Sequence, residues 1–397
     1  MDNETHTPRQ TGTRLFTRDF IFSFFAYFFF LAAVNSLTPT LPIYLARLSS
    51  KEGEIGVLIG ILAVASLASR LFVGRVLLSY RAKSVMMVGT LASVVIFLAY
   101  IVCRPFWPFF AVRLLQGAAW ACIDTAAITS ILGIIPYAYQ GRALGYFMLA
   151  PSLAMAVAAP FGMFLVGQFS FTTLFVSCAG LSLCTLFLSW KTQDQSIALS
   201  HEATASRFAS FLNLKIIAPA ISSFLQLFVW GSVTAFFPLY AIQCGVANPG
   251  LFFSAMAISM IVGRIFGGTI LDTFNKEKIL LTCFSVSTVA LITLSLSRTL
   301  LMFIIVGAFW GIGAAFFLPA SMSYAFEYAG TSDGAAVGTF RAFSDLGLGI
   351  GPVIIGVIIP LTGYRIMFLC LAGIVVFNLC YFQFYVRKKR NIAAQAA

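Results

Sequence analysis

The stretch Arg113-Leu-Leu-Gln-Gly-Ala-Ala-Trp-Ala-Cys-Ile-Asp124, which continues through apolar residues to Pro136, decides how this chain is organised. It has the length and composition of one long apolar helix, yet it carries an arginine and an aspartate. Arg113 and Asp124 are eleven positions apart, about three helical turns, so both lie on one face. A charge inside a membrane-spanning helix costs roughly 2.5–3.5 kcal/mol on insertion scales and therefore faces protein or a water-filled cavity. The stretch predicts a polar cavity within a membrane.

The composition of the whole chain agrees with a membrane protein. The 397 residues are 60% hydrophobic and 10% charged, whereas a soluble domain carries about 25% charged residues. The apolar runs are long enough for spanning helices and lack the alternation of barrel strands. No Walker A loop and no nucleophile–base pair can be recognised, and both histidines lie in polar segments. We therefore expect no enzymatic activity, no cofactor and no metal site.

Twelve apolar segments follow one another, and one polar stretch separates the first six from the last six. The domains predicted from this pattern are a tail at 1–18, a six-helix bundle at 19–191, a linker at 192–210, a second six-helix bundle at 211–386 and a tail at 387–397. The predicted spans are 19–47, 53–78, 84–103, 106–136, 139–168, 170–191, 211–243, 248–272, 276–297, 299–329, 332–360 and 363–386.

The distribution of basic residues predicts the orientation in the membrane. With both termini inside, about three basic residues lie at inner ends and loops for each one at the outer ends, as the positive-inside rule requires. The net charge of +12 is thereby explained without a nucleic-acid partner. The expected location is the bacterial cytoplasmic membrane, with both termini cytoplasmic.

The two halves of the sequence repeat each other. Ser69-Arg70-Leu-Phe-Val-Gly74 matches Gly263-Arg264-Ile-Phe-Gly-Gly268 at an offset of 194, and Gly145 matches Gly338 at an offset of 193. Parallel six-span repeats about an axis along the membrane normal are typical of one large transporter class.

On these residues the chain resembles the major facilitator superfamily over essentially all twelve spans. Arg113-x-x-Gln116-Gly117 is similar to the span-4 motif of its drug:proton antiporters, and Gly347-Leu-Gly-Ile-Gly351-Pro352 is similar to their glycine-proline motif, although it lies in span 11. The runs from Asn35 and from Ser344 resemble efflux permeases of the arabinose-efflux type. The resemblance implies an all-α fold of two six-helix repeats that transports a small molecule by alternating access.

The resemblance also implies a gate at the inner ends of spans 2 and 8. The family's loop after span 2 carries an acid, which is Leu78 in the first copy here and Asp272 in the second. A one-sided latch between Asp272 and the start of span 5 near Arg142 would follow, because a helix N-terminus and an arginine both attract a carboxylate. The expected gate residues are Arg70, Gly74, Arg142, Arg264, Gly268 and Asp272.

Polar residues present in only one half of the repeat are the better candidates for function. By this criterion Arg113 and Asp124 correspond to Gly307 and Leu318 in the other half. A buried carboxylate suits proton coupling because burial favours its neutral form and a nearby arginine its charged form. Arg341 and Asp345 are a second asymmetric pair, although their i, i+4 spacing also allows a purely structural bond. The expected proton-coupling residues are Asp124, Arg113, Asp345 and Arg341, and a locked structural ion pair is the alternative.

The family resemblance implies that spans 1, 4, 7 and 10 line the central cavity. Aromatic and amide side chains there suit an amphipathic organic ligand. The expected cavity residues are Asn35, Tyr44, Gln116, Trp120, Gln226, Trp230, Tyr240 and Trp310.

The function predicted from the sequence is proton-driven export of a small amphipathic or chelating organic compound. Proton-coupled uptake of a sugar, organic acid or nucleoside is an alternative, and a lipid flippase or a transport-silent scaffold is an alternative of another class. The expected partners are the small-molecule substrate, protons and the lipid bilayer, and the chain is expected to be a monomer.

Overall fold

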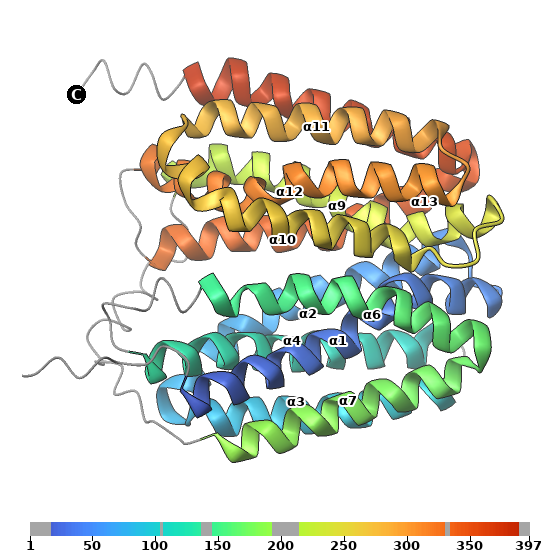
Figure 1. Cartoon of the computed structure of the whole chain (residues 1–397), viewed down its shortest axis with the longest axis vertical. Coiled ribbons are helices and arrows are strands. Elements are labelled where there is room, and N and C mark those ends of the chain that lie inside the picture. The colour runs from blue at the N-terminus through green and yellow to red at the C-terminus, as the bar shows by residue number, and fades with distance from the viewer. Residues whose placement is uncertain (1–16, 104–105, 136–144, 193–213, 330–333, 389–397) are drawn as a thin grey trace, which may run out of the picture.

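The computed structural model describes residues 17–103, 106–135, 145–192, 214–329 and 334–388, and almost all of them are helical. The helices lie side by side with nearly parallel axes (Figure 1). They are α1 (Arg18–Arg47), α2 (Glu52–Ser79), α3 (Ala82–Val102), α4 (Phe106–Ile134), α6 (Leu149–Gln168), α7 (Phe171–Lys191), η2 (Leu214–Ile216), α9 (Ile217–Gln243), α10 (Gly250–Thr273), α11 (Lys276–Leu296), α12 (Leu300–Ala329), α13 (Gly334–Tyr381) and η3 (Phe382–Val386).

The predicted fold class is confirmed. Within the described residues, ten helices are long and apolar enough to cross a membrane, and α10 adds a shorter apolar stretch, Gly250–Ile265. Helix α13 contains two of the predicted spans, because the chain reverses at Gly363, whose φ of 76° lies in the left-handed region that glycine adopts without strain. The predicted span 139–168 corresponds to the apolar stretch Gly145–Gln168, which contains α6 from Leu149, and residues 136–144 lie outside the described part.

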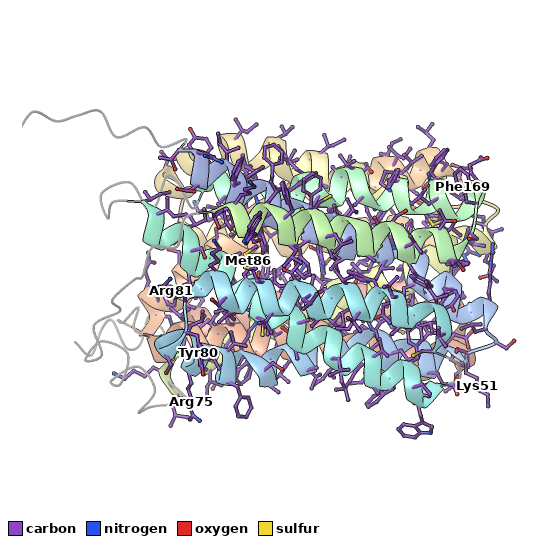
Figure 2. The ribbon with its side chains drawn as sticks, turned by 90° about the horizontal axis from the view of Figure 1, so that it is seen from below. Lys51, Arg75, Tyr80, Arg81, Met86 and Phe169 are labelled. Carbon is purple, nitrogen blue, oxygen red and sulfur yellow. The ribbon has the colours of Figure 1, made fainter. Side chains whose placement is uncertain are left out.

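The bundle has two ends, which we name by the chain segments they hold. The terminal end holds the start of α1 at Arg18 and the end of α2 at Ser79, and the distal end holds the turn between α1 and α2. Figure 2 shows Arg75, Tyr80 and Arg81 at the terminal end and Lys51 and Phe169 at the distal end. Each spanning helix therefore leads from one end to the other, and its residue numbers give the depth of each side chain.

Helices α1 to α7 form one half of the molecule and helices α9 to α13 the other, as Figure 1 shows. The halves meet mainly where α2 packs on α13 and where α6 packs on α10. Both contacts depend on glycine near the distal end. A methyl group at Gly60 would lie 2.0 Å from the carbonyl oxygen of Gly349, and one at Gly250 would lie 2.5 Å from that of Ala159. Side chains would hold these helices apart, so the distal end is closed by backbone contact.

The predicted glycine-proline motif of α13 serves two neighbours at once. Gly347 and Gly351 face α9, where an added methyl group would lie 2.2 Å from the carbonyl oxygens of Phe224 and Phe228. Gly349 and Gly356 face α2 across the boundary between the halves. The motif therefore lets α13 pack tightly on its own half and on the opposite half.

Candidate functional site

A cavity of about 380 Å³ lies between the two halves of the bundle. Its walls come from α1, α2, α4, α6, α9 and α13, so both halves contribute to it. The charged residues that line it are Arg70, Arg113, Asp124, Arg341 and Asp345. A volume of this size fits a small organic molecule.

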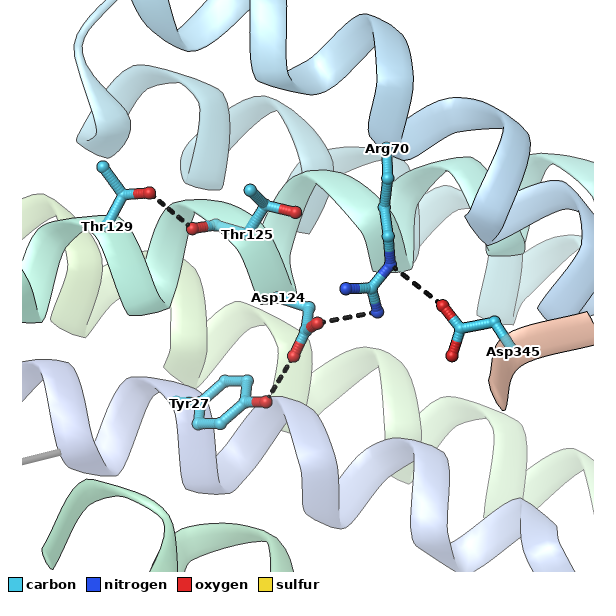
Figure 3. Close-up of polar contacts among 6 residues, drawn as sticks. All are labelled: Tyr27, Arg70, Asp124, Thr125, Thr129 and Asp345. Carbon is cyan, nitrogen blue, oxygen red and sulfur yellow. Dashed lines mark hydrogen bonds and ion pairs between the residues drawn. The ribbon is translucent and has the colours of Figure 1, made fainter. Parts of the chain in front are cut away.

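The charged cluster at one wall of this cavity is centred on Arg70 of α2 (Figure 3). One guanidinium nitrogen, Nη2, lies 2.8 Å from Oδ2 of Asp124 on α4. Its Nε lies 3.7 Å from Oδ2 of Asp345 on α13, which belongs to the other half. Arg70 therefore lies between two carboxylates, one from each half of the protein.

Tyr27 of α1 completes the surroundings of Asp124. Its hydroxyl donates a hydrogen bond of 2.5 Å to Oδ1 of Asp124, and its ring stacks on Phe147 with 5.0 Å between the ring centroids. The tyrosine is buried, which holds the hydroxyl in place. The two oxygens of Asp124 thus have separate partners, one a cation and one a neutral donor.

Arg113 has a different environment from the one that the sequence implies. It is 5% exposed, and its guanidinium donates to the carbonyl oxygens of Leu58 and Ile59 and to the side-chain oxygen of Gln116. Tyr100 donates to the same oxygen of Gln116. Arg113 therefore joins α4 to α2, whereas the cation beside Asp124 is Arg70.

Arg341 and Asp345 share one face of α13 but do not form an ion pair with each other. The carboxylate of Asp345 approaches Arg70 instead. In the part of the chain that the structure describes, Arg341 makes no hydrogen bond and no ion pair. The self-contained structural pair considered from the sequence is therefore absent there.

Only part of the predicted cavity lining faces the cavity. Asn35, Trp120 and Trp230 line it. Gln226 and Trp310 lie inside the second half, where both donate to the hydroxyl of Ser287.

The remaining predicted lining residues, both tyrosines and Gln116, also bond within the protein. Tyr44 donates to the carbonyl oxygen of Tyr100 at 3.5 Å, and Tyr240 donates to that of Ser297 at 2.7 Å. Gln116 is held by Arg113 and Tyr100. These polar groups satisfy buried backbone and side-chain partners, which membrane interiors require.

The two arginines related by the repeat make related contacts. Arg264 of α10 donates to the carbonyl oxygen of Met148 and, at 2.8 Å, to the hydroxyl of Ser152, so it reaches the opposite half as Arg70 does. At the offset of 193, Ser152 corresponds to Asp345. The contact made by Arg70 therefore involves the carboxylate of Asp345, whereas the contact made by Arg264 involves the neutral hydroxyl of Ser152.

The other expected gate residues give less information. Gly74 is partly buried near the end of α2. Gly268 and Asp272 lie in α10, but their side-chain surroundings are outside the described part, and so is Arg142. The latch expected at Asp272 is therefore neither supported nor opposed.

Sequence reasoning missed Tyr27 and placed Arg70 at a gate. The repeat assigns Arg70 to a gate because Arg264 is its equivalent in the other half. A charge within a span nevertheless needs a partner, whether or not the repeat conserves it. Among the carboxylates, Asp124 and Asp345 are the two that lie away from the ends of the predicted spans, and that position was the signal that could have linked Arg70 to both. Tyr27 stands in a run of aromatic residues and gave no separate signal.

Comparison with known proteins agrees with the fold. The family model described as Major Facilitator Superfamily matches residues 23–300 and 220–396. Multidrug resistance protein MdtG of Klebsiella pneumoniae is 25% identical over 92% of both chains. The staphylopine export protein of Staphylococcus aureus is 21% identical over 68% of this chain and 71% of its own. The crystal structure of a mutant of the nucleoside transporter NupG has a TM-score of 0.76 at 14% identity and covers 92% of this chain and 100% of its own.

The chain belongs to the Major Facilitator Superfamily. It is an integral membrane protein that transports a small molecule through the lipid bilayer, and it is not an enzyme.

Proposed function

We propose that this protein exports a small amphipathic organic compound in exchange for protons, by alternating access. The observation that carries the proposal is the position of Arg70 between Asp124 and Asp345. This cluster lies in the wall of the cavity that would hold the substrate, and it includes the boundary between the halves. One proton on either carboxylate would therefore act on both the substrate site and the contact between the halves.

The physical argument concerns the charge of the cluster. With both carboxylates ionised, one arginine faces two negative charges, and the tyrosine hydroxyl stabilises the charge on Asp124. A proton on Asp124 removes its attraction for Arg70 and leaves Asp345 as the partner of that cation. Because Asp345 belongs to the other half, a proton on Asp124 changes how strongly Arg70 is attracted across the boundary between the halves.

Alternating access follows if substrate and proton bind in turn. Protonation of Asp124 from outside accompanies release of the compound there, through the change at the boundary between the halves, and deprotonation inside precedes binding of the next molecule. The halves rock about the central cavity, and the glycine contacts between α2 and α13 close the distal end in one state.

Export is favoured over uptake because one relative is named an export protein, for staphylopine, and another is named a multidrug resistance protein, which suits removal of a compound from the cell. We further propose that the protein is a monomer in a bacterial inner membrane, with the terminal end in the cytoplasm. The basic residues near that end, among them Arg81 and Lys83, support this orientation. The two bundles at 19–191 and 211–386 would then move as the two rocking units.

The experiment is a proton-flux measurement on purified protein in liposomes that contain a pH-sensitive dye. A proton gradient is imposed, a panel of candidate compounds is added, and the wild type is compared with Asp124→Asn. Glu54→Gln is the matched control, because Glu54 lies at the distal start of α2, where its carboxylate accepts from the backbone of Lys51.

The proposal expects compound-triggered proton movement in the wild type and in Glu54→Gln, with loss in Asp124→Asn. The direction of the proton movement distinguishes antiport, in which the compound leaves as the proton enters, from symport, in which both enter together. Proton movement that persists in Asp124→Asn would contradict the assignment of coupling to Asp124. No movement with any compound would contradict proton coupling and favour a flippase or a scaffold.

A further inference from the structure

The guanidinium of Arg341 is a cation in the cavity wall that the described part of the protein leaves without a direct partner. Arg341 lines the cavity and is exposed there. It makes no hydrogen bond and no ion pair with any residue in the described ranges. Asp345, one turn further along α13, is directed to Arg70. Arg341 is near enough to Asp345 for their charges to attract, but no direct bond within the described residues occupies its donors, so in the empty cavity they face water and are available to a ligand.

The other arginines of the cavity are already occupied. Arg70 lies against two carboxylates, and Arg113 donates to three oxygens of the protein. The lining holds three arginines and two aspartates, so it carries one positive charge in excess when both acids are ionised. Arg341 is the lining arginine whose donors are free for a ligand within the described residues.

The lining near these charges is apolar and aromatic. Trp120 of α4 and Trp230 of α9 come from opposite halves, and Met155 and Leu348 add aliphatic surface. The Trp230 ring packs against Trp310 with 5.5 Å between the ring centroids, which holds it in place. Such a surface accepts the flat apolar body of a small molecule, whereas a guanidinium binds a carboxylate through two parallel hydrogen bonds.

We propose that the transported compounds are organic anions, which place a carboxylate on Arg341 and an aromatic or aliphatic body between Trp120 and Trp230. This inference rests on the transport function proposed above, since it assigns the substrate class of the same cavity. It does not depend on proton coupling, because it concerns the binding step alone.

The test measures binding by isothermal titration calorimetry with the full-length protein purified in detergent. Three probes share an indole ring and differ in charge: indole-3-acetate is an anion, tryptophol is neutral and tryptamine is a cation. The expected order is strongest binding of indole-3-acetate, at least tenfold tighter than tryptophol, with tryptamine weakest. Equal binding of the three probes, preference for tryptamine, or no binding of indole-3-acetate at millimolar concentration would overturn the proposal.

Two variants of Arg341 locate the binding. Arg341→Gln should weaken indole-3-acetate at least tenfold and leave tryptophol unchanged, whereas Arg341→Lys should keep part of the preference for the anion. Arg298→Gln is the control, because Arg298 lines a separate cavity at the distal end, and it should bind as the wild type does. Unchanged binding of indole-3-acetate in Arg341→Gln, or its loss in Arg298→Gln, would overturn the assignment.

The same variants separate this inference from the proposed function. Anion binding without proton movement in liposomes would leave the substrate class standing and remove the proton coupling. Proton movement triggered only by neutral or cationic compounds would leave the proton coupling standing and remove the assignment of organic anions as substrates.

Discussion

At the scale of single residues, Asp124 is defined by the partners of its two oxygens. Arg70 binds one oxygen as a cation, and Tyr27 donates to the other as a neutral group. Asp345 approaches the same arginine from the opposite half. The balance among these four side chains decides how easily a proton binds, and each can be changed singly.

Tyr27→Phe removes the hydrogen bond to Asp124 and keeps the ring that stacks on Phe147. A hydrogen bond to a charged group contributes about 1.5–3 kcal/mol, and 1.4 kcal/mol corresponds to a tenfold effect. We expect compound-triggered proton movement to slow about tenfold or more, with a midpoint of thermal unfolding in detergent lowered by less than in Arg113→Met, which loses three such bonds. Transport at the wild-type rate would show that the hydroxyl has no part in coupling.

Arg113→Met tests the structural role of the other arginine. The variant keeps an apolar stem but loses the bonds to Leu58, Ile59 and Gln116. Because such bonds from a charged donor contribute about 1.5–3 kcal/mol, we expect a clearly lower midpoint of thermal unfolding than in Asp124→Asn. A midpoint equal to that of the wild type would return Arg113 to the candidates for coupling.

The sequence identified Asp124 and Asp345 as unusual because a carboxylate within an apolar span stands out in any composition. It did not link Arg70 to Asp124 or Arg113 to α2, because spacing on one helix gives the face of a side chain but not which neighbouring helix lies there. Trp310 and Gln226 were misplaced for the same reason: both lie on the expected helices, but they face Ser287 on α11.

At the scale of elements, α13 stands between the two halves. Its glycines allow contact with α9 on one face and with α2 on the other, and Asp345 on the same helix reaches Arg70. The glycine-rich pattern was visible in the sequence and indicated close packing. Which helices it contacts depends on the tertiary arrangement.

Gly60→Leu tests the backbone contact between α2 and α13. Its added Cβ would lie 2.0 Å from the carbonyl oxygen of Gly349, so the helices must separate near the distal end. Spin labels are placed at the exposed residues Thr172 and Thr299 of opposite halves, in a chain whose native cysteines are replaced by alanine. We expect a longer label-to-label distance in the variant.

Gly180→Leu is the matched control, because nothing lies within 4 Å of a Cβ at that position. It should leave the distance between the labels unchanged. An unchanged distance in Gly60→Leu would mean that the glycine contact does not hold the distal end closed.

At the scale of the whole molecule, the repeat in the sequence anticipated two similar halves. The apolar segments anticipated most helix ends to within a few residues, and the starts of α6 and α9 differ more. The similarity of the halves does not reveal the difference between their arginine contacts, on which the proposed function depends. Arg70 and Arg264 reach across the boundary in related ways, but one meets Asp345 and the other meets Ser152. Of these two contacts, the one made by Arg70 involves a carboxylate, so it is the one that changes when a proton binds.

The most direct test of this account is a distance across the terminal end as a function of pH. Spin labels replace the exposed residues Tyr80 at the end of α2 and Phe274 after α10, which belong to opposite halves. Because a proton on Asp345 removes the charge that holds Arg70 across the boundary between the halves, the account predicts that the wild-type distance lengthens as the pH falls. In Asp345→Asn, which lacks the carboxylate of the other half, the distance should be long at every pH. A wild-type distance that does not change with pH, or an Asp345→Asn variant that behaves as the wild type does, would contradict it.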